Sequence, residues 1–191
     1  MKVFNRFASN RAPSARQKQR GLSILGALFA LVIGALLTIV TVNAFQDSQR
    51  KTRVSAALQD IQTMTSDLQK NYGSANQYGA LTTAGAVQTG IVPPRLRVTG
   101  TTTANNSYNG AITFLPDTIT VANDTAVMTF ANVPQSDCAD LVFGSEQLAR
   151  RVTVGATVVK VADAVLQPVL LGTACDAAAP VSIAFAIGRK G

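Results

Sequence analysis

Two features of this sequence could undergo covalent chemistry: a basic leader that ends at a glycine, and a pair of cysteines. Residues 1–21 carry six basic side chains and no acidic one, and Gly21 is followed directly by the apolar Leu22. A secretory signal peptide has its cleavage site after its apolar stretch. Here the candidate cleavage site, between Gly21 and Leu22, comes before that stretch, so the processed protein would keep it.

The two cysteines, Cys138 and Cys175, both follow the apolar stretch and fall in the part of the chain that we expect to be exported. Exported cysteine pairs form disulfides more often than metal sites or redox couples. The sequence therefore predicts a disulfide that closes a long loop, and two buried free thiols are the alternative.

Other catalytic chemistry has little support. The sequence contains no histidine, the commonest general base and metal ligand. We interpret Asp137 as a helix cap and Asp140 and Glu146 as solvated helix positions. Asp117 and the run Asn123-Asp124-Thr125 lack the spacing of a calcium-binding loop and are typical of turns. The sequence thus predicts a protein that is not an enzyme and has no cofactor and no metal.

The charge distribution predicts the orientation of the chain. The formal net charge is +7, and removing the six charges of residues 1–21 leaves about +1 for the other 170 residues. Basic residues before a membrane helix hold that end in the cytoplasm, so the C-terminal part should be exported. The short basic spots Arg95-x-Arg97 and Arg150-Arg151 are typical of solubilising residues, and we expect no specific nucleic acid partner.

Residues 22–45 contain no charge and supply enough apolar positions to cross a bilayer as a helix. Gly26, Ala30 and Gly34 recur every four residues and share one side of that helix. Small residues at this spacing allow two helices to approach closely in a membrane. The alternative is that glycine and alanine are simply common in membrane helices.

Residues 46–72 predict an amphipathic continuation of the same helix, which ends near Gly73. Its apolar side is formed by Val54, Ala57, Leu58, Ile61, Met64, Leu68 and Tyr72, and most charged residues lie elsewhere. One face of this segment should therefore pack against a soluble domain.

Residues 73–191 predict an exported globular head. Thr82 or Thr83 is expected to cap a short helix that ends near Gly90, and Ser136 or Asp137 to cap a second helix that runs to about Arg150. Strand patterns are found at 111–115, 118–122, 126–130, 152–161 and 181–187. Strands beside a long helix indicate an α+β fold, with the N-terminal helix packed on a small, mainly antiparallel sheet.

The junction, the long helix and the cysteine pair together resemble a type IV pilin, and the long basic leader is similar to those of the type IVb subgroup. Two stretches, Asn71–Thr83 with Thr89–Pro93 and Asn132–Val142, resemble segments of thin-pilus pilins. The resemblance implies cleavage between Gly21 and Leu22 by a prepilin peptidase, followed by N-methylation of Leu22. It also implies that Cys138 and Cys175 enclose the surface-exposed variable region.

The resemblance further implies the partners of the chain. The precursor would lie in the inner membrane, meet a pilus assembly platform, and polymerise with copies of itself into a surface filament for conjugation, adhesion or aggregation. A recipient or host cell surface would be a further partner. One departure matters: the family usually carries a glutamate at the fifth mature position, where this chain has Gly26.

Three alternatives remain open. The chain could be a minor or tip pilin that binds a cell surface through residues 139–174. It could be a pseudopilin of a type II secretion system, which shares the junction and the helix. It could also be a single-pass membrane protein that does not assemble.

Overall fold

The computed structural model describes residues 24–73, 78–176 and 179–188. The chain divides into two compact units, residues 1–44 and 45–191. In chain order the elements are α1 (Ile24–Tyr72), α2 (Thr83–Gln88), the 3-10 helix η1 (Pro94–Leu96), β1 (Ala104–Asn105), β2 (Ala111–Asp117), β3 (Thr125–Val133), α3 (Gln135–Ser145), β4 (Arg151–Val154), β5 (Thr157–Lys160), α4 (Pro168–Cys175) and β6 (Val181–Gly188). The predicted α+β class is confirmed.

One face of α1 in the second unit is buried against the head. No proline interrupts this helix, and it ends where the predicted stop Gly73 follows Tyr72. The buried apolar residues recur at spacings of three and four, as one face of a helix requires. They are Val54, Ala57, Ile61, Met64 and Leu68, with Leu58 and Tyr72 partly buried against them. The predicted amphipathic segment is therefore confirmed.

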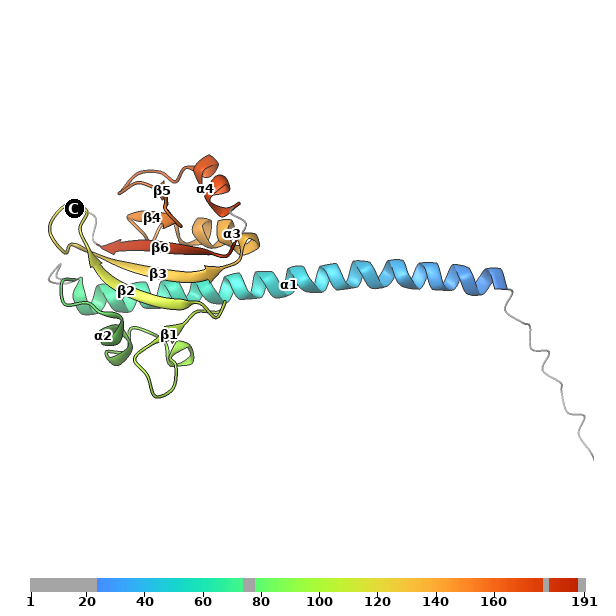
Figure 1. The fold of residues 1–191 in the computed structure, drawn as a ribbon, viewed down its shortest axis with the longest axis horizontal. Coiled ribbons are helices and arrows are strands. Elements are labelled where there is room, and N and C mark those ends of the chain that lie inside the picture. Colours follow the sequence, from blue (N-terminus) through green and yellow to red (C-terminus); the bar gives the residue numbers. More distant parts are fainter. Residues whose placement is uncertain (1–23, 74–77, 177–178, 189–191) are drawn as a thin grey trace, which may run out of the picture. The chain divides into compact units, whose positions relative to one another are not determined.

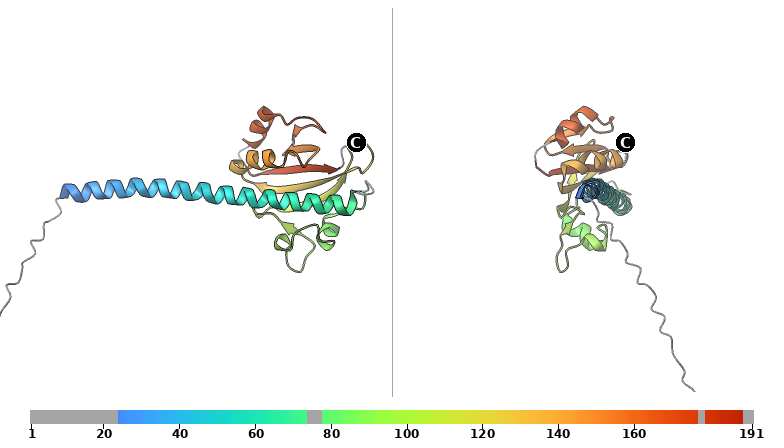
Figure 2. Two further views of the ribbon diagram at one scale, coloured as in Figure 1. Left: turned by 180° about the vertical axis from the view of Figure 1, so that it is seen from behind. Right: turned by 90° about the vertical axis from the view of Figure 1, so that its right-hand side faces the viewer.

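The sheet has six strands in the order β1-β2-β3-β6-β4-β5, and every neighbouring pair is antiparallel. Residues 45–72 of α1 lie along the sheet, with α2 and β1 at one edge and β4, β5 and α4 at the other (Figures 1 and 2). Buried and less buried residues alternate along β3, as expected for a strand with one face on the core. Phe130 of β3 and Phe185 of β6 meet edge to face, with ring centroids 6.3 Å apart.

Helix α3 approaches α1 closely at a glycine. A Cβ atom added to Gly144 would lie 2.5 Å from Cδ1 of Leu58 and 2.8 Å from its Cδ2. Real side chains do not approach this closely, so a larger residue at 144 would displace Leu58 from the α1–α3 contact.

Two of the predicted strands differ in the structure. Residues 118–122 form a turn, because the Asp124 carboxylate accepts backbone hydrogen bonds there and competes with a strand ladder. The predicted strand 152–161 is a hairpin, β4 and β5, which turns at Gly155 with a φ of 58°. The left-handed conformation at this position favours glycine.

The helices also differ in part from the prediction. Thr82 caps α2 as expected, and its hydroxyl accepts from the backbone N–H of Gly85 at 3.0 Å. Helix α3 starts earlier than predicted, with Pro134 as its N-cap, and ends at Ser145 rather than near Arg150. Helix α4 was not predicted. It has only 8 residues, most of them apolar, and they lack helical periodicity.

We predict that Gly144→Val lowers the free energy of unfolding by about 1–3 kcal/mol, because its side chain collides with Leu58. Urea unfolding of the full chain in detergent would measure this. Gly172→Val is the matched control, since a Cβ there meets nothing within 4 Å, and its effect should stay within about 0.5 kcal/mol. The penalty at Gly144 should shrink in a Leu58→Ala background; an unchanged penalty there would contradict the proposed collision.

Candidate assembly segment and head surface

The first unit contains the residues that the sequence analysis predicts to take part in filament assembly. The processing site, Gly21 and Leu22, lies outside the described residues. From Ile24 onward the large apolar side chains of α1 are mostly exposed on all sides of the helix. The most exposed are Ile24, Phe29, Leu31, Leu36 and Leu37, at 59–82%.

The predicted helix-packing stripe, Gly26, Ala30 and Gly34, is exposed along its whole length. A Cβ added at Gly34 meets nothing within 4 Å. Their role in close packing against a helix of another subunit stays a prediction. The sequence also predicts a membrane-spanning segment over residues 22–45; among the described residues, no helix is both long and apolar enough to cross a membrane.

The hydroxyl groups of the two threonines on this part of α1 donate hydrogen bonds to backbone carbonyls of the same helix. Thr38 donates to the backbone carbonyl of Gly34 at 2.8 Å, and Thr41 to that of Thr38 at 2.9 Å. These bonds to the preceding turn remove the need for a polar partner outside the helix. The segment can therefore enter an apolar environment without leaving these hydroxyls unpaired.

The predicted disulfide is confirmed, and the alternative of two free thiols is wrong. Cys138 in the first half of α3 is bonded to Cys175 at the end of α4, with their Cα atoms 5.7 Å apart. The bond closes a segment that contains β4, β5 and most of α3 and α4. A disulfide typically stabilises a fold by about 2–4 kcal/mol.

A charged cluster joins α1 to α3 and corrects our interpretation of Asp137. This residue is not a cap: it lies in the first turn of α3, is fully buried, and its Oδ1 is 3.3 Å from Nε of Arg50. Arg53 lies 4.0 Å from its other oxygen, and Arg50 also pairs with Asp140. Burial and the Asp137 carboxylate together raise the pKa of Tyr108. The cluster fixes α3 against α1 with one buried charge and two partly exposed partners.

A second charged network shows that the basic pair 150–151 is not solubilising. The guanidinium of Arg150 is only 5% exposed and lies 2.7 Å from Asp163 and 3.4 Å from Asp124. Asp124 also accepts from the backbone N–H groups of Ile119 and Thr120 at 2.8 and 2.9 Å. This network ties the turn before β3 to the start of β4 and to the loop after β5.

The pKa of Asp124 reflects its position in this network. Burial by itself would raise this pKa, but the backbone hydrogen bonds from residues 119–121 and the nearby Arg150 lower it to about 2. Asp60 of α1 shows the opposite balance. It is buried beside Arg95, and burial raises its pKa although Arg95 acts to lower it. Arg95 is therefore a partner of a buried carboxylate, and not only a solubilising residue.

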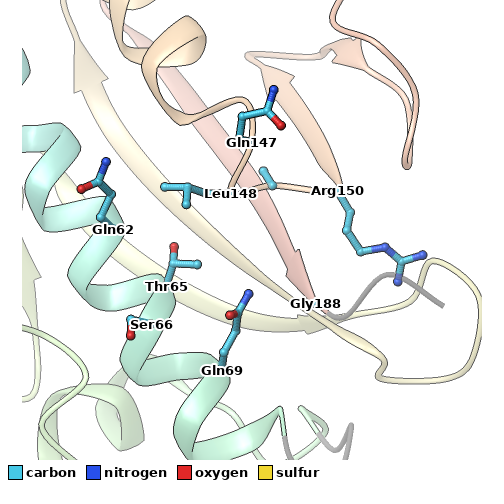
Figure 3. Close-up of a pocket in the computed structure, with 9 residues that line it drawn as sticks. Gln62, Thr65, Ser66, Gln69, Gln147, Leu148, Arg150 and Gly188 are labelled. Atoms are coloured by element: carbon cyan, nitrogen blue, oxygen red, sulfur yellow. The ribbon is translucent and has the colours of Figure 1, made fainter.

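A polar groove lies on the other side of α1 from α2 and η1, and the sequence did not reveal it. Figure 3 shows Gln62, Thr65 and Gln69 of α1 facing the connection between α3 and β4. A glutamine on the polar side of an amphipathic helix looks the same in the sequence whether it lines a groove or faces open solvent. Across the described ranges 24–73, 78–176 and 179–188, no group of three potential metal ligands is found.

Comparisons with known proteins identify the class to which this fold belongs. Residues 51–187 match the family model described as PilS N terminal. A solved type IVb pilin from Salmonella typhi has a TM-score of 0.54 and 23% identity, covering 73% of this chain and 99% of its own. TcpA, a type IV pilin from the El Tor biotype of Vibrio cholerae, has a TM-score of 0.53 and 18% identity, covering 71% and 98%.

The family match spans most of the chain, and the chain therefore belongs to the PilS family of type IVb pilins. Comparison with curated proteins yields no match. As a pilin the protein is a structural pilus subunit without enzymatic activity, which polymerises into a pilus.

We predict that the Asp124 carboxylate stops stabilising the fold at strongly acidic pH, where it becomes protonated. Its folded pKa of about 2 lies below the ordinary value of 3.8. The contribution is therefore complete above about pH 5 and is mostly lost as the pH falls to about 2. Two pKa units correspond to about 2–3 kcal/mol.

Urea unfolding of the full chain in detergent between pH 2 and pH 7 would measure this dependence. The gap in stability between the wild type and Asp124→Asn should narrow as the pH falls from 4 to 2. Val121→Ala is the control, because this exposed side chain carries no titratable group, and its effect on stability should not change over this pH range. A gap that stays constant over this pH range would contradict the assignment.

Proposed function

We propose that the protein is the major structural subunit of a type IVb-like pilus used for conjugation, adhesion or aggregation. A prepilin peptidase would cut between Gly21 and Leu22 and methylate the new terminus. Residues 22–45 would then polymerise into the core of the filament. The observation that supports this best is the apolar part of α1. Its described large side chains from Ile24 to Val42 are 47–82% exposed.

The location of the precursor follows from the sequence. The basic leader and the charge-free run 22–45 support a precursor that is held in the inner membrane, where an assembly platform would extract it. On assembly, contacts between neighbouring helices would replace the earlier surroundings of the apolar side chains. The head would form the outer surface of the fibre, with the disulfide-closed segment available to a recipient or host cell.

A second candidate is a minor or tip pilin that binds a cell surface. Two observations favour it. Gly26 stands where the family usually carries a glutamate. In addition, the disulfide-closed segment exposes Val165 and Val169, each at 80%. Exposed apolar side chains grouped on one segment are typical of interaction sites.

We predict that the main component of sheared fibres begins at Leu22 with a methylated amino group. N-terminal sequencing and intact-mass measurement of the sheared material would test this. A chain that stays with the membrane and keeps residues 1–21 would contradict the pilin proposal. A trace component that begins at Leu22 would favour the minor pilin.

We predict that Gly26→Leu reduces the yield of fibres at least severalfold, because a large side chain on the small-residue stripe keeps neighbouring helices apart. Quantitative immunoblotting of sheared fibres against total cell protein would measure the yield. Ala35→Leu is the matched control, because this residue lies on the opposite side of the helix. Equal yields from the two variants would contradict a packing role for the stripe.

A further inference from the structure

The groove beside α1 has the dimensions of a small-molecule site. Its volume is about 500 Å³, within the range of about 300–1,000 Å³ that is usual for ligand pockets. One wall is a single face of α1, and the other is the connection between α3 and β4 with the end of β6. The lining residues are Gln62, Thr65, Ser66, Gln69, Gln147, Leu148, Ala149, Arg150 and Gly188.

The polar groups of this groove have hydrogen-bonding capacity that the chain does not use. Thr65 is only 3% exposed, and its hydroxyl has no hydrogen-bond partner among the described residues. In Figure 3 it points from α1 toward Leu148, between the side chains of Gln62 and Gln69. A buried hydroxyl without a partner costs about 1–3 kcal/mol. A ligand that supplies a partner would recover part of this free energy.

Among the described residues that line the groove, Arg150 is the one with a charged side chain. Its guanidinium already binds Asp124, Asp163 and the hydroxyl of Thr120. Figure 3 shows this guanidinium pointing away from Gln62 and Thr65. The described lining therefore offers a carboxylate or phosphate ligand no unpaired cation, and an apolar ligand would leave the carboxamides unpaired.

The remaining chemistry favours a neutral ligand with many hydroxyl groups. A glutamine carboxamide both donates and accepts, as does a sugar hydroxyl. Gln62 and Gln69 lie two helical turns apart, about 10.5 Å along the axis, so a ligand that contacts both has several polar groups in a row. Leu148 provides an apolar surface for the C–H groups of a sugar ring.

We propose that this groove binds a neutral saccharide. The inference rests on the proposed function in one respect: a fibre would repeat the groove along its length. Many weak sites on one fibre would then bind a glycan-covered surface with high avidity. The site differs from the exposed valines Val165 and Val169 of the disulfide-closed segment. It assigns Gln62, Thr65 and Gln69 a recognition role.

Saturation-transfer NMR on sheared fibres tests the proposal, with D-galactose, D-mannose, D-glucose, N-acetyl-D-glucosamine and lactose as probes. We expect saturation transfer to at least one sugar from wild-type fibres. The signal should fall at least fivefold in Gln62→Ala/Gln69→Ala fibres. It should be unchanged in Gln59→Ala/Gln88→Ala fibres, because these two exposed glutamines lie outside the groove.

Several results would overturn the proposal. Wild-type fibres that transfer to none of the sugars would do so, as would a signal that survives in the groove variant. Loss of fibres in the groove variant, with thermal unfolding unchanged, would assign the groove to a neighbouring subunit instead. If that variant fails to fold, Gln62→Met/Gln69→Met keeps the side-chain size without the carboxamides and should lose the signal as well.

Failure of the fibre itself is a separate result. If the wild type makes no fibres, the proposed pilus function fails. The same NMR measurement on the detergent-solubilised full chain then decides the saccharide proposal.

Discussion

The contact between residues 45–72 of α1 and the sheet is the interaction on which the head depends. Ile61, Met64 and Leu68 are fully buried, and burial of one such side chain contributes about 1.5–3 kcal/mol. The strands cannot form a closed core by themselves, because an antiparallel sheet with one apolar face needs a second layer. From Ile24 to Val42 the described large apolar side chains of the same helix are exposed instead.

The buried charges determine how the loops are arranged around this core. Asp137 joins α3 to α1 through Arg50, and Asp60 joins α1 to η1 through Arg95. Arg150 joins three segments that are distant in sequence. Such pairs contribute little net stability compared with apolar contacts, but loss of one partner leaves a buried charge uncompensated. Their effect is therefore to make one arrangement of the loops much more favourable than the others.

The sequence predicted the parts of the structure that depend on local periodicity. The spacing of Val54, Ala57 and Ile61 revealed the buried face of α1, and the runs of β-forming residues at 126–130 and 181–187 revealed β3 and β6. It failed where a hydrogen bond or an ion pair made by a single side chain decides the outcome. The residues 118–122 have β-forming side chains, yet the Asp124 carboxylate holds them in a turn. Asp137 was predicted to be a helix cap, yet it is buried in the first turn of α3 and pairs with Arg50, 87 positions earlier in the chain.

The sequence by itself determined the fold class, the amphipathic helix, the cysteine pair and the resemblance to a type IVb pilin. Each of these depends on residue types and on their spacing over a few positions or at a regular period, which can be seen in the sequence. Only the tertiary structure decided which polar residues are buried and which surround a groove. Gln62, Thr65 and Gln69 lie on the polar side of a helix, and the α3–β4 connection encloses them only after the sheet has packed on α1. The chemistry of that surface depends on contacts between distant segments, and no local pattern records them.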